Sequence, residues 1–119
     1  MSVSMYHNPK CSKCRATLAL LQEKGIEPEL ILYLETAPSA AELAAMLKKL
    51  GKGPQAVIRF NEDIAKELGL SPTDERPDAE WLNIISANPK LLERPIVING
   101  DRAAIGRPPE NVLAILGNL

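Results

Sequence analysis

Apolar and polar positions near the start of the chain predict a strand, a helix and a second strand. The run over residues 3–6 is typical of a strand, and the apolar spacing over 11–24 predicts a helix that ends before Gly25. The nearly continuous apolar run over 29–34 predicts a second strand that is buried on both faces. Elements in this order form a βαβ unit with parallel strands and a right-handed crossover.

The middle of the chain, about residues 39–92, has helical spacing instead. Ser39 and Glu42 predict a capping box at the start of its first helix. Asn61 and Asp78 are the expected caps of two further helices. Because no flexible linker flanks this stretch, we expect it to be a helical insertion into the sheet and not a separate domain.

The sheet is predicted to resume over 94–98, and the Asn-Gly pair at 99–100 is a strong hairpin signal. Residues 102–105 should return as an antiparallel partner, followed by a last helix that begins near 106–110. The predicted fold class is therefore α/β. A four-stranded mixed sheet with flanking helices and a helical insertion is the outline of a thioredoxin-like domain, expected to span residues 1–119 as one unit.

Charge and hydropathy limit the classes of function. The net charge is −1 and there is no basic tail, which argues against general binding of nucleic acid or membrane surfaces. No apolar run approaches the ~18 residues of a membrane span, and the N-terminus does not have the pattern of a signal peptide. We therefore expect a cytoplasmic protein, and a monomer, since no excess of apolar positions is visible.

The turn between the first strand and the first helix holds both cysteines and the single histidine, within residues 7–14. Cys11 lies at the start of the helix, where unpaired N–H groups and the helix dipole favour an anion. Lys10 and Lys13 add positive charge. A thiol in this place should have a lowered pKa, and the thiolate is its reactive form. Cys14 lies one turn along the same face, so the two cysteines can form and break a disulfide.

Three interpretations of this turn are open. The cysteines could be two small buried residues, or they could bind zinc together with His7. A closed structural zinc site has four ligands and the chain holds no fourth Cys or His, so we expect no metal. Redox chemistry is favoured, with Cys11 as the nucleophile and Cys14 as its potential resolving partner. His7 could support the thiolate as an imidazolium, or it could be an ordinary hydrogen-bonded residue at the end of the strand.

Three arginines outside the turn stand in unusual contexts. Arg59 interrupts an apolar segment, Arg94 precedes Pro95 at the start of a strand, and Arg107 lies between a glycine and two prolines. Each alone is more often a surface or loop charge. In a thioredoxin-like sheet, however, the loop before the third strand faces the cysteine turn, and its Arg94-Pro95 bond is expected to be cis. Three guanidinium groups around a thiolate would suit a tetrahedral oxyanion.

Over essentially its whole length the chain resembles the arsenate reductase family of the glutaredoxin-coupled, thioredoxin-fold type. The matching segments are Tyr6-His7-Asn8-Pro9 with Cys11, Ile31 to Glu35, Arg59, Leu92 to Val97, and Gly106-Arg107-Pro108. The resemblance implies that Cys11 is the nucleophile and that His7 assists its thiolate. The substrate-binding residues it implies are Arg59, Arg94 and Arg107.

The resemblance implies no bound cofactor, with electrons supplied by glutathione and glutaredoxin, or by thioredoxin. Many members lack a cysteine at the position of Cys14 and recruit glutathione, so either thiol could resolve an arsenic adduct in this chain. Related Spx-type regulators carry a Cys-x-x-Cys switch and bind RNA polymerase, but they do not keep an arginine matching Arg107. A redox-switch regulator and a general dithiol oxidoreductase stay open as alternatives, as does an oxyanion other than arsenate.

Overall fold

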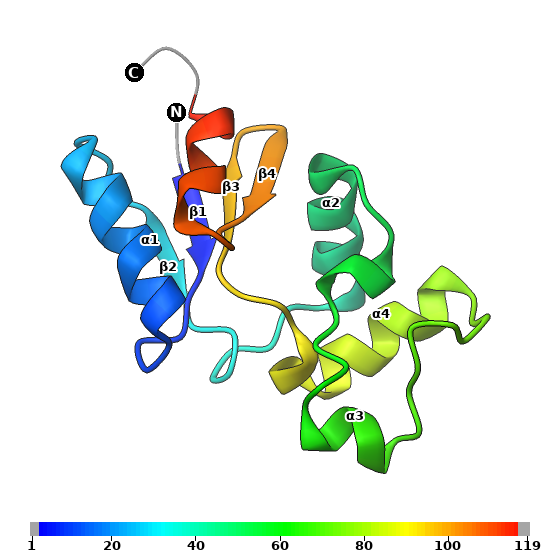
Figure 1. Ribbon diagram of the computed structural model, residues 1–119. Coiled ribbons are helices and arrows are strands. Elements are labelled where there is room, and N and C mark those ends of the chain that lie inside the picture. The colour runs from blue at the N-terminus through cyan, green and yellow to red at the C-terminus, as the bar shows by residue number, and fades with distance from the viewer. Residues whose placement is uncertain (1–2, 117–119) are drawn as a thin grey trace. The chain divides into compact units, whose positions relative to one another are not determined.

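The computed structural model describes residues 3–116, which divide into two compact units. One unit runs up to Thr36 and resumes at Arg94, and it contains the sheet; the other, Ala37–Glu93, is helical (Figure 1). These boundaries lie close to those predicted for the insertion. That the two units form a single domain stays a prediction.

The sheet has four strands in the order β2-β1-β3-β4. β1 pairs in parallel with β2 and antiparallel with β3, and β3 pairs antiparallel with β4. The mixed sheet and the hairpin after residue 99 are confirmed. The strands are β1 (Val3–Tyr6), β2 (Glu29–Ile31), β3 (Ile96–Asn99) and β4 (Arg102–Ile105).

The prediction for the second strand was wrong in both length and burial. β2 ends at Ile31, and its residues Glu29 and Leu30 are exposed. The reason is its place at the edge of the sheet, where it pairs with β1 alone. The chain then turns, because the backbone N–H groups of Glu35 and Thr36 both donate to the carbonyl oxygen of Leu32.

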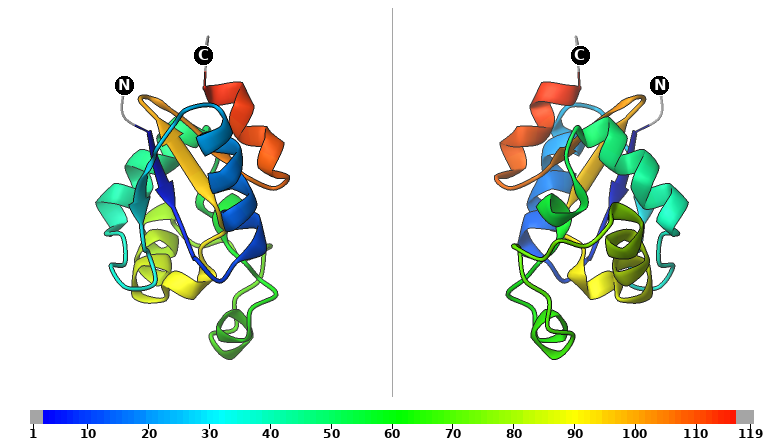
Figure 2. Two further views of the ribbon diagram at one scale, coloured as in Figure 1. Left: turned by 90° about the vertical axis from the view of Figure 1, so that its left-hand side faces the viewer. Right: turned by 90° about the vertical axis from the view of Figure 1, so that its right-hand side faces the viewer.

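Two helices pack against each other on one face of the sheet (Figure 2). They are α1 (Ser12–Glu23) and η3 (Pro109–Ile115), of which the second is a 3-10 helix. The core that includes this layer contains apolar residues from the sheet and both helices, such as Met5, Leu21, Val97 and Val112, together with the two cysteines. The turn between β1 and α1, which holds the two cysteines, is therefore anchored in the core of its unit.

The helical unit is built around α2 (Ala40–Leu50) and α4 (Asp78–Ala87), which pack on each other. The capping box predicted for α2 is confirmed: Glu42 N donates to Ser39 Oγ at 3.1 Å, and Ser39 N donates to Glu42 Oε1 at 3.0 Å. The shorter helices of this unit are η1 (Pro54–Val57), α3 (Asp63–Glu67) and η2 (Pro89–Leu91).

Two predicted helix caps were wrong. The cap of α3 is Glu62 and not Asn61, and the cap of α4 is Pro77 and not Asp78. Neither cap makes a side-chain hydrogen bond to its helix. The tight turn in which Glu62 N donates to the carbonyl oxygen of Arg59 shifts the start of α3 by one residue. Asp78 is the first residue of α4, where its carboxylate still faces the positive end of the dipole.

Within residues 3–116, none of the helices is both long and apolar enough to cross a membrane.

Candidate active site

Cys11 is the residue that caps α1, at the end of the turn that leaves β1. Its backbone is extended (φ −89°, ψ 124°), and its N–H donates to the carbonyl oxygen of Asn8 at 2.9 Å. The side chain of Asn8 closes the same turn by accepting a hydrogen bond from Lys10 N at 3.0 Å. Cys11 is 7% exposed, so its sulfur is held at the edge of the core with a small opening to solvent. The prediction that it lies at the helix start is confirmed.

The pKa values of the two free thiols are shifted in opposite directions from that of an ordinary cysteine. Burial raises the pKa of Cys11, but hydrogen bonds from the backbone and thiol of Cys14, the charge of Arg94 and the backbone N–H of Lys13 lower it below its ordinary value. Burial, aided by the nearby charge of Cys11, raises the pKa of Cys14 to about 11. Cys11 is therefore the thiolate of the pair and Cys14 the thiol.

Alkylation should separate the two cysteines. In the reduced protein near neutral pH, iodoacetamide is expected to modify Cys11 and to spare Cys14, because Cys14 is fully buried and protonated. The rate at Cys11 should rise with pH around a midpoint below that of an ordinary cysteine thiol, since a lowered pKa keeps the thiolate at lower pH. Peptide mapping by mass spectrometry across a pH series measures both rates; preferential labelling of Cys14 would contradict the assignment.

Arg107 connects the cysteine turn to the loop before β3. Its Nε donates to the carbonyl oxygen of Arg94 at 2.7 Å, and its Nη2 lies 3.8 Å from Cys11 Sγ. The Arg94-Pro95 peptide bond is cis, as predicted, and the Arg107-Pro108 bond is cis as well. The sheet unit thus brings two of the three predicted arginines, Arg94 and Arg107, to the thiolate.

Gly106, the residue before Arg107, packs closely against α1 and against Pro95, the residue after Arg94. Its N–H donates to the carbonyl oxygen of Pro95 at 2.9 Å. A Cβ atom at this position would lie 2.7 Å from Thr17 Oγ1 and 2.8 Å from Pro95 Cγ, closer than Cβ atoms approach in folded proteins. Because Gly106 has no side chain, its backbone can pack directly on α1, immediately before Arg107 in the chain.

Arg59 belongs to the helical unit, and its part in the site stays a prediction. Its backbone N–H donates to the carbonyl oxygen of Leu91 at 2.7 Å. Its Nη1 donates to Glu62 Oε1 at 2.6 Å, with both side chains partly exposed. Sequence reasoning missed Glu62, although an acidic residue three positions after an arginine is a detectable signal for a local ion pair.

His7 is buried, with 4% of its surface exposed. Its backbone N–H donates to the carbonyl oxygen of Ile31 at 2.9 Å, and its Nδ1 finds no hydrogen-bond partner among residues 3–116. Burial lowers the pKa of His7, so the neutral imidazole is favoured near neutral pH. This supports neither a fixed positive charge nor a fully hydrogen-bonded imidazole, and a catalytic part for His7 stays a prediction.

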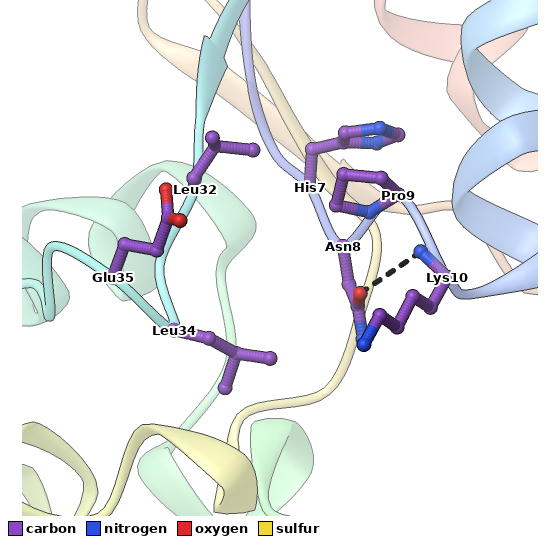
Figure 3. Close-up of a pocket in the computed structure, with 7 residues that line it drawn as sticks. All are labelled: His7, Asn8, Pro9, Lys10, Leu32, Leu34 and Glu35. Atoms are coloured by element: carbon purple, nitrogen blue, oxygen red, sulfur yellow. Dashed lines mark hydrogen bonds between the residues drawn. The ribbon is translucent and has the colours of Figure 1, made fainter.

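A pocket of about 320 Å³ opens beside the cysteine turn. Figure 3 shows its two sides: His7 to Lys10 lie opposite Leu32, Leu34 and Glu35. The pocket therefore offers an ammonium and a carboxylate next to apolar side chains, one residue away from Cys11 in the chain. Within the described part of the chain, no group of three His, Cys, Asp or Glu side chains could hold a metal ion.

The fold and the site together define a class of protein. A thioredoxin-like sheet unit carries a Cys-x-x-Cys pair at the start of its first helix, which is the arrangement of thiol-based redox proteins. Arg107, beside the Cys11 sulfur, adds a donor that suits an anionic ligand.

Comparison with known proteins identifies the family within this class. The chain belongs to the ArsC family, whose family model matches residues 6–115. The arsenate reductase of Haemophilus influenzae is 51% identical over 117 residues, which cover 98% of this chain and 100% of that protein. The uncharacterized protein YfgD of Escherichia coli is 50% identical over 116 residues, 97% of each chain.

A solved structure supports the same assignment. The arsenate reductase from Vibrio cholerae superposes with a TM-score of 0.92 at 49% identity, covering 98% of both chains. The predicted resemblance and the predicted thioredoxin-like fold class are thereby confirmed.

Proposed function

We propose that this protein is an arsenate reductase in which the Cys11 thiolate attacks arsenate. The observation that carries the proposal is the position of Arg107, with Nη2 3.8 Å from Cys11 Sγ. A disulfide-exchange site does not require a guanidinium at the nucleophile, whereas the forked donors of a guanidinium match the oxygens of an oxyanion substrate. The arsenate reductases of Haemophilus influenzae and Vibrio cholerae, each about half identical to this chain, support the same activity.

In the proposed reaction, arsenate binds to Arg94 and Arg107, with Arg59 as the third ligand. The Cys11 sulfur forms a bond to arsenic, and one oxygen of arsenate leaves as hydroxide and is protonated to water. A second thiol then attacks the Cys11 sulfur, the sulfur–arsenic bond breaks, and its electron pair stays on arsenic. Arsenic is reduced from the +5 to the +3 state, and two thiols are oxidised to one disulfide.

The electron donors proposed for this cycle are glutathione with glutaredoxin, or thioredoxin, with no cofactor bound to the chain. We further propose that the protein works in the cytoplasm as a monomer. The proposed reaction begins with reduced thiols, and the cytoplasm is a compartment in which cysteines stay reduced.

Arsenate-dependent oxidation of NADPH tests the function. One reaction contains glutathione, glutaredoxin and glutathione reductase, and the other contains thioredoxin with its reductase. We expect turnover and arsenite formation in at least one of them, and none when sulfate replaces arsenate. Absence of turnover in both would overturn the proposal and favour the redox-switch regulator, for which recovery of RNA polymerase in one redox state is the corresponding test.

The ion pair of Arg59 provides a separate test of its proposed contact with the oxyanion. In the structure, Glu62 Oε1 accepts a hydrogen bond from Arg59 Nη1 at 2.6 Å. The Glu62 carboxylate would therefore compete with arsenate for this guanidinium. Glu62→Gln should lower KM for arsenate by at most about five-fold, because exposed pairs contribute only ~0.2–1 kcal/mol, and it should leave kcat nearly unchanged. Steady-state kinetics measure the change, with Glu80→Gln, which removes the carboxylate paired with Arg76, as the matched control. An unchanged or raised KM would contradict a role for Arg59 in binding.

A further inference from the structure

We propose that Cys14 resolves the arsenic adduct, so that the chain releases arsenite by forming its own Cys11–Cys14 disulfide and needs no glutathione for this step. The inference rests on the proposed arsenate reductase function and deepens it. It makes the electron donor a dithiol protein of the thioredoxin or glutaredoxin type, which reduces a disulfide within the chain.

The first argument is the geometry of the α1 start. Cys11 caps the helix and Cys14 is its third residue, the two positions between which a helix cap normally makes its hydrogen bond. Cys11 and Cys14 also lie close enough for each thiol to shift the pKa of the other, and both are buried in the same core cluster. The two side chains are therefore neighbours in the reduced protein, at the spacing of a Cys-x-x-Cys pair that can form a disulfide.

The second argument is access. Cys14 is fully buried and belongs to the same core cluster as Cys11, whose own exposed fraction is 7%. Arg107 occupies part of the surroundings of the Cys11 sulfur, and the bound arsenic would take the remaining opening. A free thiol from solution would have to enter this crowded space, whereas Cys14 already lies in the same core cluster as Cys11. A reacting group held in place has an effective concentration far above that of any free thiol.

The chemistry balances without a further reactant. Cys14 loses its proton and attacks the Cys11 sulfur, forming the sulfur–sulfur bond while the sulfur–arsenic bond breaks towards arsenic. One arsenate and two thiols give one arsenite, one disulfide and one water. To reset the site, a thiolate of the donor protein attacks the Cys11 sulfur, the more exposed of the two, and Cys14 leaves as a thiolate that takes up a proton from solvent. The second thiol of the donor then attacks the donor's own sulfur in this mixed disulfide, which releases the Cys11 thiolate and leaves the donor oxidised.

If Cys14 is the resolving thiol, the rate of the resolving step should depend on the ionisation of Cys14. Burial raises the pKa of Cys14 to about 11, so only a small fraction is thiolate near neutral pH. Arsenite release in a single turnover should therefore speed up as the pH rises, over a range in which Cys11 is already ionised. Resolution by glutathione would instead follow the ionisation of glutathione and its concentration.

A single-turnover experiment tests the proposal. The full chain is reduced, freed of reductant and mixed with arsenate without any added thiol. We expect one arsenite per chain, a loss of the mass of two hydrogen atoms in the intact protein, and both cysteines blocked to alkylation. Cys14→Ser should release no arsenite until glutathione is added. Ser12→Ala, on the same turn, is the matched control and should behave as the natural chain.

The outcomes distinguish this proposal from the proposed function. If the natural chain releases arsenite only after glutathione is added, Cys14 is not the resolving thiol, although arsenate reduction stands. If neither the natural chain nor any thiol system yields arsenite, the reductase function itself fails. Should Cys14→Ser not fold by circular dichroism, the mass and thiol count of the natural chain still decide the question without a variant.

Discussion

Replacing Cys11 by serine is expected to abolish arsenate reduction. The pKa of the Cys11 thiol is lowered by hydrogen bonds from the start of α1 and by the charge of Arg94, but a serine hydroxyl stays protonated even there. An oxygen at this position also cannot supply the electrons of a disulfide. Loss of a covalent nucleophile costs up to ~10⁶-fold in kcat in other enzymes.

The coupled NADPH assay and direct arsenite detection both measure this loss. Cys11→Ser should show no signal above a reaction without protein, while circular dichroism shows the same fold, because a hydroxyl is smaller than a thiol. Turnover retained at even a hundredth of the natural rate would rule out Cys11 as the nucleophile.

Arg107→Lys is expected to have the second-largest effect, a loss of ~10²–10³-fold in kcat/KM, as for removal of one donor to a developing oxyanion. The guanidinium of Arg107 makes two contacts at once, with Nε on the Arg94 carbonyl at 2.7 Å and Nη2 at 3.8 Å from Cys11 Sγ. A lysine ammonium is a single point of charge on a flexible stem and cannot make both.

Two measurements check the Arg107 prediction. Steady-state kinetics with arsenate give the loss of kcat/KM, and the pH midpoint of Cys11 alkylation should rise because a donor near the thiolate is displaced. Arg102→Lys is the control: this arginine is exposed on β4 and donates from Nη2 to the Ala114 carbonyl at 2.7 Å. Equal losses in the two variants would show that Arg107 acts on the fold and not on the substrate.

Local patterns in the sequence predicted those parts of the fold that depend on neighbouring residues. The capping box of Ser39 and Glu42, the hairpin after Asn99 and the placement of Cys11 at a helix start are all formed within a few residues. Two local predictions failed by one residue, because α3 and α4 begin after Glu62 and Pro77 and not after Asn61 and Asp78. The larger failure involves the rest of the sheet: β2 is short and exposed because it is an edge strand, and the periodicity of one segment does not predict the order of the strands.

The candidate site was predictable in its members but not in its contacts. Arg94 and Arg107 were singled out by the prolines that follow them, yet their hydrogen bond joins residues thirteen positions apart and depends on the β3–β4 hairpin. The lowered pKa of His7 depends on its burial by side-chain packing, for which hydropathy gives no signal. The position of Arg59 in the proposed anion site stays a prediction.

The close packing at Gly106 has a consequence for protein engineering. A designer who wished to change the preferred oxyanion would randomise the positions around Cys11, and residue 106 is adjacent to Arg107. Any side chain there meets Thr17 and the ring of Pro95 within 3 Å, so nearly every member of such a library would be lost to overpacking. Diversity is better introduced at Lys10 and Glu35, which are exposed at the neighbouring pocket. Selectivity could be evolved there while the arginine loops keep their contact with the helix.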